Sequence, residues 1–193
     1  MKKRAFTILE LVIVVGIVAI LISLLFPALK AHFEGARINE AKAQLLVLKA
    51  ALAQYQREFG DYPPSSGYGN SSDNAGNEIM LACLRPRLRI RPFTKEIKEK
   101  EGIIARWLGD TDGDGWPEFL DPWKNPWIYF HPSDYSRGAV YYTRKGKRIT
   151  VEPARKGDVY QNLNSYQLWC CGPNLTDESD KSGLGDDIGN LMR

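Results

Sequence analysis

The sequence lacks the residue patterns that most enzyme classes need. It contains only two histidines, His32 and His131, and neither belongs to a recognisable nucleophile or metal motif. It also has no serine elbow, no zinc-protease motif and no phosphate loop. These absences argue against an enzyme and favour a structural or binding role.

Cysteine is scarce, with three residues that form no CxxC pair. The sequence therefore gives no sign of a zinc site or of a thioredoxin-like redox site. Two alternatives stay open for Cys83, Cys170 and Cys171. One is a single disulfide between Cys83 and either of the other two, which requires a location outside the cytoplasm. The other is three small thiols that are at least half-buried.

Positive charge is not in excess over most of the chain. The formal net charge is +3, and the three basic residues at positions 2–4 account for all of it. No global basic field therefore points to nucleic acid. Four arginines between positions 85 and 91 alternate with prolines and aliphatic residues. No aromatic residues are interleaved and the prolines stiffen the segment, which favours a solvated edge strand over a nucleic-acid contact.

A long hydrophobic run is present near the N-terminus. Residues 6–29 are interrupted only by Thr7, Glu10, Ser23 and by glycine or proline. At about 1.5 Å per residue, a helix of this length crosses the roughly 30 Å core of a bilayer. The preceding basic residues predict that the N-terminus stays in the cytoplasm and the rest of the chain lies outside. The run is too long for a cleaved signal and continues into a helical pattern, so it predicts a retained anchor.

One carboxylate, Glu10, interrupts this run. A charged side chain inside a bilayer costs several kcal/mol unless it is paired, and such residues usually have a function. No cation lies one helical turn away within the run. The partner is therefore expected to come from another subunit or from a newly made N-terminal amine. The alternative is a shallow position from which Glu10 reaches the headgroups.

The residues around Glu10 resemble the processing and assembly signal of type IV prepilins and type II secretion pseudopilins. Residues 3–14 read Lys-Arg-Ala and then Phe-Thr-Ile-Leu-Glu-Leu-Val-Ile-Val. The resemblance implies that a prepilin peptidase cuts between Ala5 and Phe6 and that the new amine is methylated. It also implies that Glu10 neutralises the amine of a neighbouring subunit during assembly. The family normally has glycine before the cut, and we expect cleavage after the nearly as small Ala5. Pro27 falls where many relatives kink the helix.

An apolar stripe continues beyond the membrane run. Alternating steps of three and four residues predict one helix face, formed by Ile38, Ala41, Leu45, Leu48, Leu52, Tyr55 and Phe59. Polar residues such as Gln44 are expected on other faces. Gly60, followed by two prolines, predicts the end of the helix. A single helix over residues 6–59 would be about 80 Å long. Two helices broken at Pro27 are the alternative.

The rest of the chain predicts a small α+β head. A Gly/Ser/Asn-rich stretch predicts a surface loop over residues 65–77, and helices are expected over 78–84 and 94–108. Antiparallel strands are expected over 126–130, 139–143, 148–151 and 166–170. Five tryptophans could form the exposed patch of a binding module, but in a small head such residues more often fill the core.

An acidic segment of the head predicts a calcium site. Five acids match the side-chain ligand positions of an EF-hand-type loop: Asp110, Asp112, Asp114, Glu118 and Asp121. Gly115 supplies the tight turn, and the carbonyl of Trp116 falls at the backbone-ligand position. The loop departs from the pattern by ending in aspartate and by having prolines at 117 and 122, where a following helix would begin. The alternative is a metal-free acidic turn.

The last third of the chain resembles the head of the major pseudopilin of type II secretion systems. The resemblance rests on residues 120–126 (Leu-Asp-Pro-Trp-Lys-Asn-Pro), 166–169 (Tyr-Gln-Leu-Trp), 172–174 (Gly-Pro-Asn) and 186–190 (Asp-Asp-Ile-Gly-Asn). It implies a type IV pilin-like fold whose C-terminal loop binds one calcium. Asp186 and Asp187 match the paired acids of that loop. Asn174 stands where relatives usually have aspartate, with Asp177 or Asp180 as candidate replacements.

The two resemblances together imply how the chain is organised and what it does. Residues 1–5 would be a leader, 6–29 a transmembrane and assembly helix, and 30–193 a periplasmic head that includes the second half of the long helix. The implied protein is a single-pass subunit of the bacterial inner membrane that polymerises through this helix and is extracted into a periplasmic pseudopilus for secretion. Prepilin peptidase, minor pseudopilins and the inner-membrane assembly platform would be its partners. A type IV pilin for adhesion or motility is the alternative.

Overall fold

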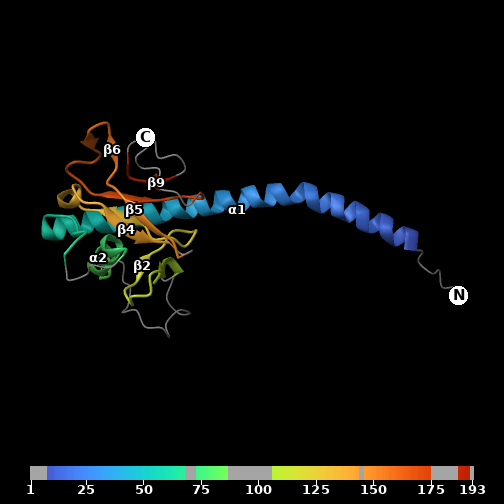
Figure 1. Ribbon diagram of the computed structural model, residues 1–193, viewed down its shortest axis with the longest axis horizontal. Coiled ribbons are helices and arrows are strands. Elements are labelled where there is room, and N and C mark those ends of the chain that lie inside the picture. The colour runs from blue at the N-terminus through green and yellow to red at the C-terminus, as the bar shows by residue number, and fades with distance from the viewer. Residues whose placement is uncertain (1–7, 68–72, 87–105, 144–145, 175–186, 192–193) are drawn as a thin grey trace. The chain divides into compact units, whose positions relative to one another are not determined.

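The computed structural model describes residues 8–67, 73–86, 106–143, 146–174 and 187–191 (Figure 1). The chain divides into two compact units, Met1–Arg37 and Ile38–Arg193, which we describe separately. In the described part of the first unit the structure is helical throughout, and the second unit is the folded head.

The helix α1 spans Ile8–Phe59, so the expectation of one continuous helix is confirmed. It contains a stretch that is long and apolar enough to cross a membrane. Every residue from 8 to 26 is exposed in the isolated chain, so this predominantly apolar stretch is not buried in the fold. The helix ends as predicted at Gly60, whose φ of 82° lies in the left-handed region that favours glycine. The backbone N–H of Gly60 donates to the carbonyl of Gln56 at 2.8 Å.

The second half of α1 packs under the head along the predicted stripe. Ala41, Leu48 and Leu52 are fully buried, and the flanking aliphatic and aromatic positions pack against the same core. Two details of the prediction are wrong. Phe59 is 62% exposed, so the buried stripe ends before it. Gln44, expected on a polar face, is completely buried. Its side-chain oxygen accepts a hydrogen bond from the indole N–H of Trp127 at 3.0 Å, which offsets part of the cost of burying a polar group.

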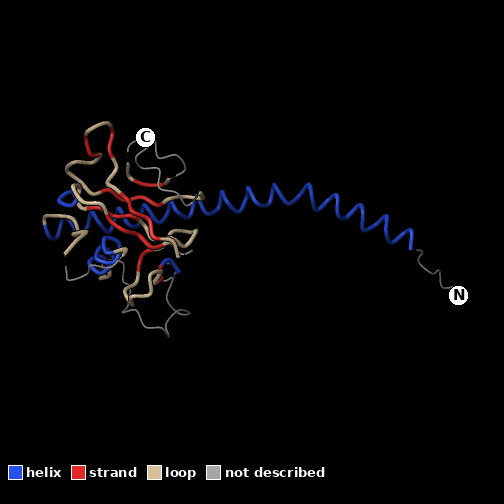
Figure 2. The backbone as a smooth tube through the Cα atoms, in the orientation of Figure 1, coloured by secondary structure: helices blue, strands red, loops and turns tan. Residues whose placement is uncertain are grey.

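The described residues of the head form a short helix, beside the second half of α1, and four small antiparallel sheets, which confirms the α+β class (Figure 2). Helix α2 spans Ala75–Leu84. The three-stranded sheet has the order β3 (Ile128–Phe130), β8 (Gln167–Cys170) and β9 (Ile188–Gly189). The two-stranded sheets pair β1 (Leu108–Gly109) with β2 (Glu118–Phe119), β4 (Ala139–Tyr142) with β5 (Arg148–Val151), and β6 (Arg155–Lys156) with β7 (Val159–Tyr160). A short 3-10 helix, η2, spans Pro132–Asp134.

Two aromatic-rich cores hold these elements together. In the larger core, α1 and α2 pack against Phe119, Trp127 and Tyr129 and against strand β8. The smaller core contains Trp169, which stacks on Phe130 with ring centroids 5.8 Å apart. Trp107, Trp127 and Trp169 are all buried, so most of the tryptophans fill the core rather than a binding patch.

The expected surface loop over residues 65–77 is wrong at its end. Asn74 and Asn77 are completely buried, and α2 begins at Ala75. The Asn77 side chain takes the place of a neighbouring strand: it accepts from the N–H of Phe119 at 2.7 Å and donates to the carbonyls of Phe119 and Trp127. A polar residue that satisfies buried backbone groups is easily mistaken for a loop residue.

The other predicted elements agree with the structure only in part. The hairpin over 139–151 and the strand near 166–170 are confirmed. The helix expected over 94–108 is wrong at Leu108, which pairs with Phe119 in β1–β2, and residues 94–105 lie outside the described residues. The edge strand expected over residues 85–92 is wrong at its start, because Arg85 caps the C-terminus of α2 in a helical conformation, and residues 87–92 lie outside the described residues. The three cysteines all lie in the described part, and none is joined in a disulfide.

Candidate functional site

The N-terminal signal is only partly within the described residues. Ala5 and Phe6, the expected processing positions, lie outside them. Glu10 lies in the first turn of α1 and is exposed, as are the apolar residues on either side. The structure therefore places a carboxylate on an uncovered apolar helix, which a bilayer or neighbouring helices would have to accommodate.

The acidic loop of the head joins β1 to β2 and is shaped by its own carboxylates. Asp110 accepts from the backbone N–H groups of Gly113 at 2.7 Å and Gly115 at 3.1 Å. Asp114 accepts from the N–H of Trp116 at 2.8 Å. Side chains that bond to the backbone two or three residues on are typical of aspartate turns. The loop therefore folds its acids toward a common centre through short-range contacts.

Two groups of carboxylates in this region have oxygens within metal-binding reach of one another. Asp110, Asp112 and Asp114 each offer an oxygen within 4.8 Å of the others. Asp112 also belongs to a second group, with Glu118 and Glu78. Glu78 was not among the predicted ligands, because it lies on α2, far from the loop in sequence. No pattern in the sequence points to it, since only the fold brings its carboxylate close to Asp112 and Glu118.

Asp112 links the two groups and carries the signs of an unsatisfied charge. Its Oδ2 atom is buried and has no hydrogen-bond partner among the described residues. Its pKa is raised to about 6, mainly by burial and in smaller part by the nearby charges of Asp114 and Asp110. A divalent cation between these groups would relieve both effects, since hard oxygen ligands are what calcium prefers.

Glu118 is completely buried and connects the loop to the rest of the head. Its oxygens accept from the N–H of Thr111 at 2.9 Å and from the amide of Asn74 at 2.7 Å. Burial nevertheless raises the pKa of Glu118 to about 7. Asn74 in turn accepts from the N–H of Tyr142 at 2.8 Å, so the network reaches strand β4.

Asp121 does not join either group of acids within the described residues. Its Oδ1 accepts from the N–H groups of Trp123 and Asn125, both at 2.9 Å, and so shapes the turn between β2 and β3. Burial raises the pKa of Asp121 to about 7. This acid, which the EF-hand spacing selected as the last ligand, occupies a turn of its own in the structure.

The C-terminal acids that the resemblance selected are described only in part. Asn174 is exposed, and Asp187 is completely buried immediately before β9. Asp177, Asp180 and Asp186 lie outside the described residues. The geometry of this second predicted calcium loop therefore remains a prediction.

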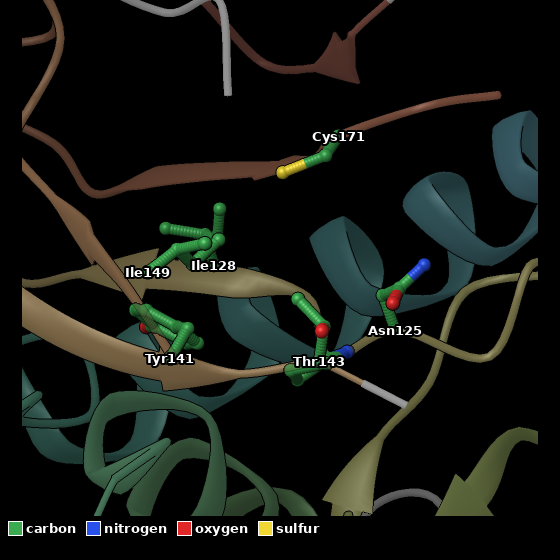
Figure 3. Close-up of a pocket in the computed structure, with 7 residues that line it drawn as sticks. Asn125, Ile128, Tyr141, Thr143, Ile149 and Cys171 are labelled. Atoms are coloured by element: carbon green, nitrogen blue, oxygen red, sulfur yellow. The ribbon is translucent and has the colours of Figure 1, made fainter. Parts of the chain in front are cut away.

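A small cavity lies close to the Asp121 turn, between β3 and the β4–β5 hairpin (Figure 3). Its volume is about 10 Å³, and the residues that line it include Asn125, Tyr141, Thr143 and Cys171. Both amide atoms of Asn125 are buried and have no hydrogen-bond partner among the described residues. A cavity of this size holds about one water molecule, far less than the roughly 300 Å³ at which ligand pockets begin. It is therefore too small for a substrate, and a single water molecule is the largest occupant that it could hold.

Comparisons with known proteins agree with the fold and with the N-terminal helix. No protein-family model matches the sequence, and no solved structure matches it. The type II secretion system core protein G of Escherichia coli is 28% identical over 134 residues, which cover 69% of this chain and 76% of that protein. The protein of the same name from Pseudomonas aeruginosa is 27% identical over 144 residues, covering 72% and 84%.

A second kind of relative is a pilus protein. The fimbrial protein of Neisseria meningitidis serogroup A is 28% identical over 119 residues, which cover 58% of this chain and 69% of that protein. Both kinds of relative fit a structural subunit rather than an enzyme. The long apolar N-terminal helix, the α+β head and these similarities together show that the chain is type IV pilin-like.

Proposed function

We propose that the chain is the subunit of a filament, anchored in the bacterial inner membrane before assembly and polymerised through residues 6–29. The observation that carries the proposal is the first half of α1, a membrane-length apolar helix with no residue buried in the single chain. In the membrane, lipid covers this surface, and in a filament the helices of neighbouring subunits cover it. A folded head on the same chain would then remain outside the helix bundle.

Assembly by this route requires processing at the N-terminus. We infer that prepilin peptidase cuts between Ala5 and Phe6 and that the new amine is methylated. The Glu10 carboxylate of one subunit then neutralises the amine of a neighbour inside the bundle. An ion pair in an apolar surrounding is strong, and a subunit placed one step out of register would leave both charges unpaired. This pairing would therefore set the register of the filament.

The filament we favour is the periplasmic pseudopilus of a type II secretion system. Supporting this choice, similarity to the two core G proteins extends over 69% and 72% of the chain, against 58% for the fimbrial protein. Minor pseudopilins and the inner-membrane assembly platform would be its partners, and the head would lie in the periplasm before extraction. A type IV pilin for adhesion or motility is the second candidate, because the fimbrial protein is equally identical over the shorter stretch.

We also propose that calcium orders the head. Asp110, Asp112 and Asp114 would provide oxygen ligands in the first loop, and the buried, unpartnered Oδ2 of Asp112 supports this. In the C-terminal loop, Asn174 and Asp187 would act together with acids from positions 177–186. The ion would supply a fixed positive charge, while the carboxylates hold the loop in a shape that apolar burial cannot impose.

Deletion of the gene in the native host separates the two candidate systems. A pseudopilus subunit is required for the release of folded proteins into the medium, and its loss leaves surface pili intact. A pilin shows the reverse pattern. Complementation with the wild-type gene and with Glu10→Ala, which is expected not to assemble, links either defect to the filament.

A further inference from the structure

The β6–β7 hairpin and the residues after it form an open groove on the head. The groove has a volume of about 550 Å³ and extends over residues 156–165. Two apolar side chains lining it, Val159 and Leu163, are 56% and 55% exposed. These two side chains give the groove an apolar surface on which an apolar side chain of another protein could be buried.

The rim of the groove is positively charged. Arg155 and Lys156 are both exposed, and the Arg155 guanidinium lies 4.2 Å from the centroid of the Tyr160 ring. Asp158 is the one acid of the β6–β7 hairpin, so the hairpin keeps a net positive charge. The expected occupant of the groove is therefore apolar at its centre and acidic at its edge.

The chain itself carries a group of this chemistry. Trp116 is 54% exposed, an exception among the tryptophans of the head. It directly follows Asp110, Asp112 and Asp114, and its N–H is fixed by the Asp114 side chain. Three carboxylates beside one exposed indole match the basic, apolar groove in charge and in polarity. A bound divalent cation would still leave this loop with one negative charge.

The two surfaces lie on opposite sides of the head. Strand β2, which the acidic loop enters, and the β6–β7 hairpin are separated by α1 and the central strands in Figure 1. They therefore do not face each other within one chain. Two different, complementary surfaces on one molecule make a head-to-tail contact, and repeated head-to-tail contacts build an open helical array rather than a closed dimer.

We propose that in the filament Trp116 of one subunit enters the 156–165 groove of a neighbouring subunit, with the acidic loop facing Arg155 and Lys156. This contact rests on the proposed filament function and adds an interface between the globular heads of neighbouring subunits to the packing of the N-terminal helices. The occupant is a second copy of this chain because the complementary charges and the anchoring aromatic side chain lie on the same molecule.

Cross-linking in assembled filaments tests the contact. Two full-length chains with different tags, one carrying Trp116→Cys and the other Leu163→Cys, are expressed together in the native host, and the filaments are treated with a short bismaleimide. We expect a dimer that contains both tags. The matched control pairs Trp116→Cys with Phe59→Cys, a comparably exposed position at 62%, and should give at least about tenfold less dimer.

The possible results distinguish failure of the proposed contact from failure of the proposed filament function. Filaments that contain the chain but give no more dimer than the control overturn the contact and leave the proposed function in place. A foreign protein captured at Leu163→Cys also overturns it. Wild-type filaments that lack this chain overturn the proposed function, and the contact with it.

Variants without cysteine cover the case in which the cysteine chains do not assemble. Removal of a buried aromatic or aliphatic anchor typically weakens an interface by about tenfold or more. Trp116→Ala and Leu163→Ala should therefore each lower the assembled fraction of the full-length chain by about tenfold, whereas Phe59→Ala should not. Equal assembly of all three variants contradicts the contact.

Discussion

Asp121→Asn should change the stability of the head in opposite directions at low and at high pH. The Oδ1 atom of Asp121 accepts two backbone hydrogen bonds, which an asparagine oxygen retains. The Oδ2 atom is buried with no hydrogen-bond partner among the described residues, and burial raises the pKa of Asp121 from 3.8 to about 7. The folded head therefore prefers a neutral side chain at this position.

The direction in which stability changes with pH follows from the number of protons that each state binds. Because the pKa is higher in the folded state, the folded head binds more protons than the unfolded chain, and stability falls as the pH rises from 3.8 through about 7. A shift of about three pKa units means that the wild-type head loses about 4 kcal/mol of its free energy of unfolding between low pH and pH values above 7. Asparagine avoids this loss at every pH, but its amide N–H group replaces Oδ2 without a partner and costs about 1–3 kcal/mol. The variant should be about 1–3 kcal/mol less stable at pH 3.5 and about 1–3 kcal/mol more stable at pH 8.

Urea unfolding followed by tryptophan fluorescence measures this crossover. The sample is a head fragment that begins at Ala31, in the presence of chelator, and the control is Asp158→Asn on the exposed β6–β7 hairpin, which should show no crossover. If Asp121→Asn were less stable by the same amount at both pH values, the proposed burial of a neutral acid would be refuted. If, in a parallel series with calcium in place of the chelator, the variant lacked the stabilisation by calcium that the wild type shows, Asp121 would be a ligand after all.

Three further perturbations test other parts of the structure. Glu10→Ala should insert into the membrane at least as well as the wild type, because a buried charge is removed, yet give few filaments in electron micrographs; a normal yield would assign Glu10 another role. Calcium at a hundredfold excess over Kd should stabilise the wild-type head by about 2.7 kcal/mol and raise its melting temperature. Asp112→Ala with Asp114→Ala should reduce this rise; an unchanged rise would place the ion elsewhere. Asn77→Ala should destabilise the head by about 2–4 kcal/mol in urea unfolding, because three buried backbone groups lose their partner; a loss below about 0.5 kcal/mol would contradict this role.

The sequence was sufficient for the parts of the fold that follow a periodic pattern. The spacing of apolar residues predicted the second half of α1, and the glycine at position 60 predicted its end. Alternating residues around a Gly/Lys-rich turn predicted the β4–β5 hairpin. In each case the local pattern and the tertiary packing favour the same conformation.

The sequence was insufficient where a polar residue serves the core. Asn77 and Gln44 are polar by type, and their burial depends on partners 42–83 residues away in sequence. Glu78 was missed for the same reason, since only the fold brings α2 to the acidic loop. Asp121 illustrates the converse: its spacing matched a ligand pattern, but a proline-rich turn placed it elsewhere. Long-range contacts of this kind have no periodic signal.

The central claim is that the chain polymerises through its processed N-terminal helix. Electron cryomicroscopy of filaments purified from the native host tests it most directly, because the map shows both the identity and the start of the subunit. We predict a core of packed helices that begins at Phe6, with Glu10 next to the N-terminal amine of a neighbour and the heads outside. Filaments without this chain, or subunits that retain residues 1–5 in the core, would contradict the claim.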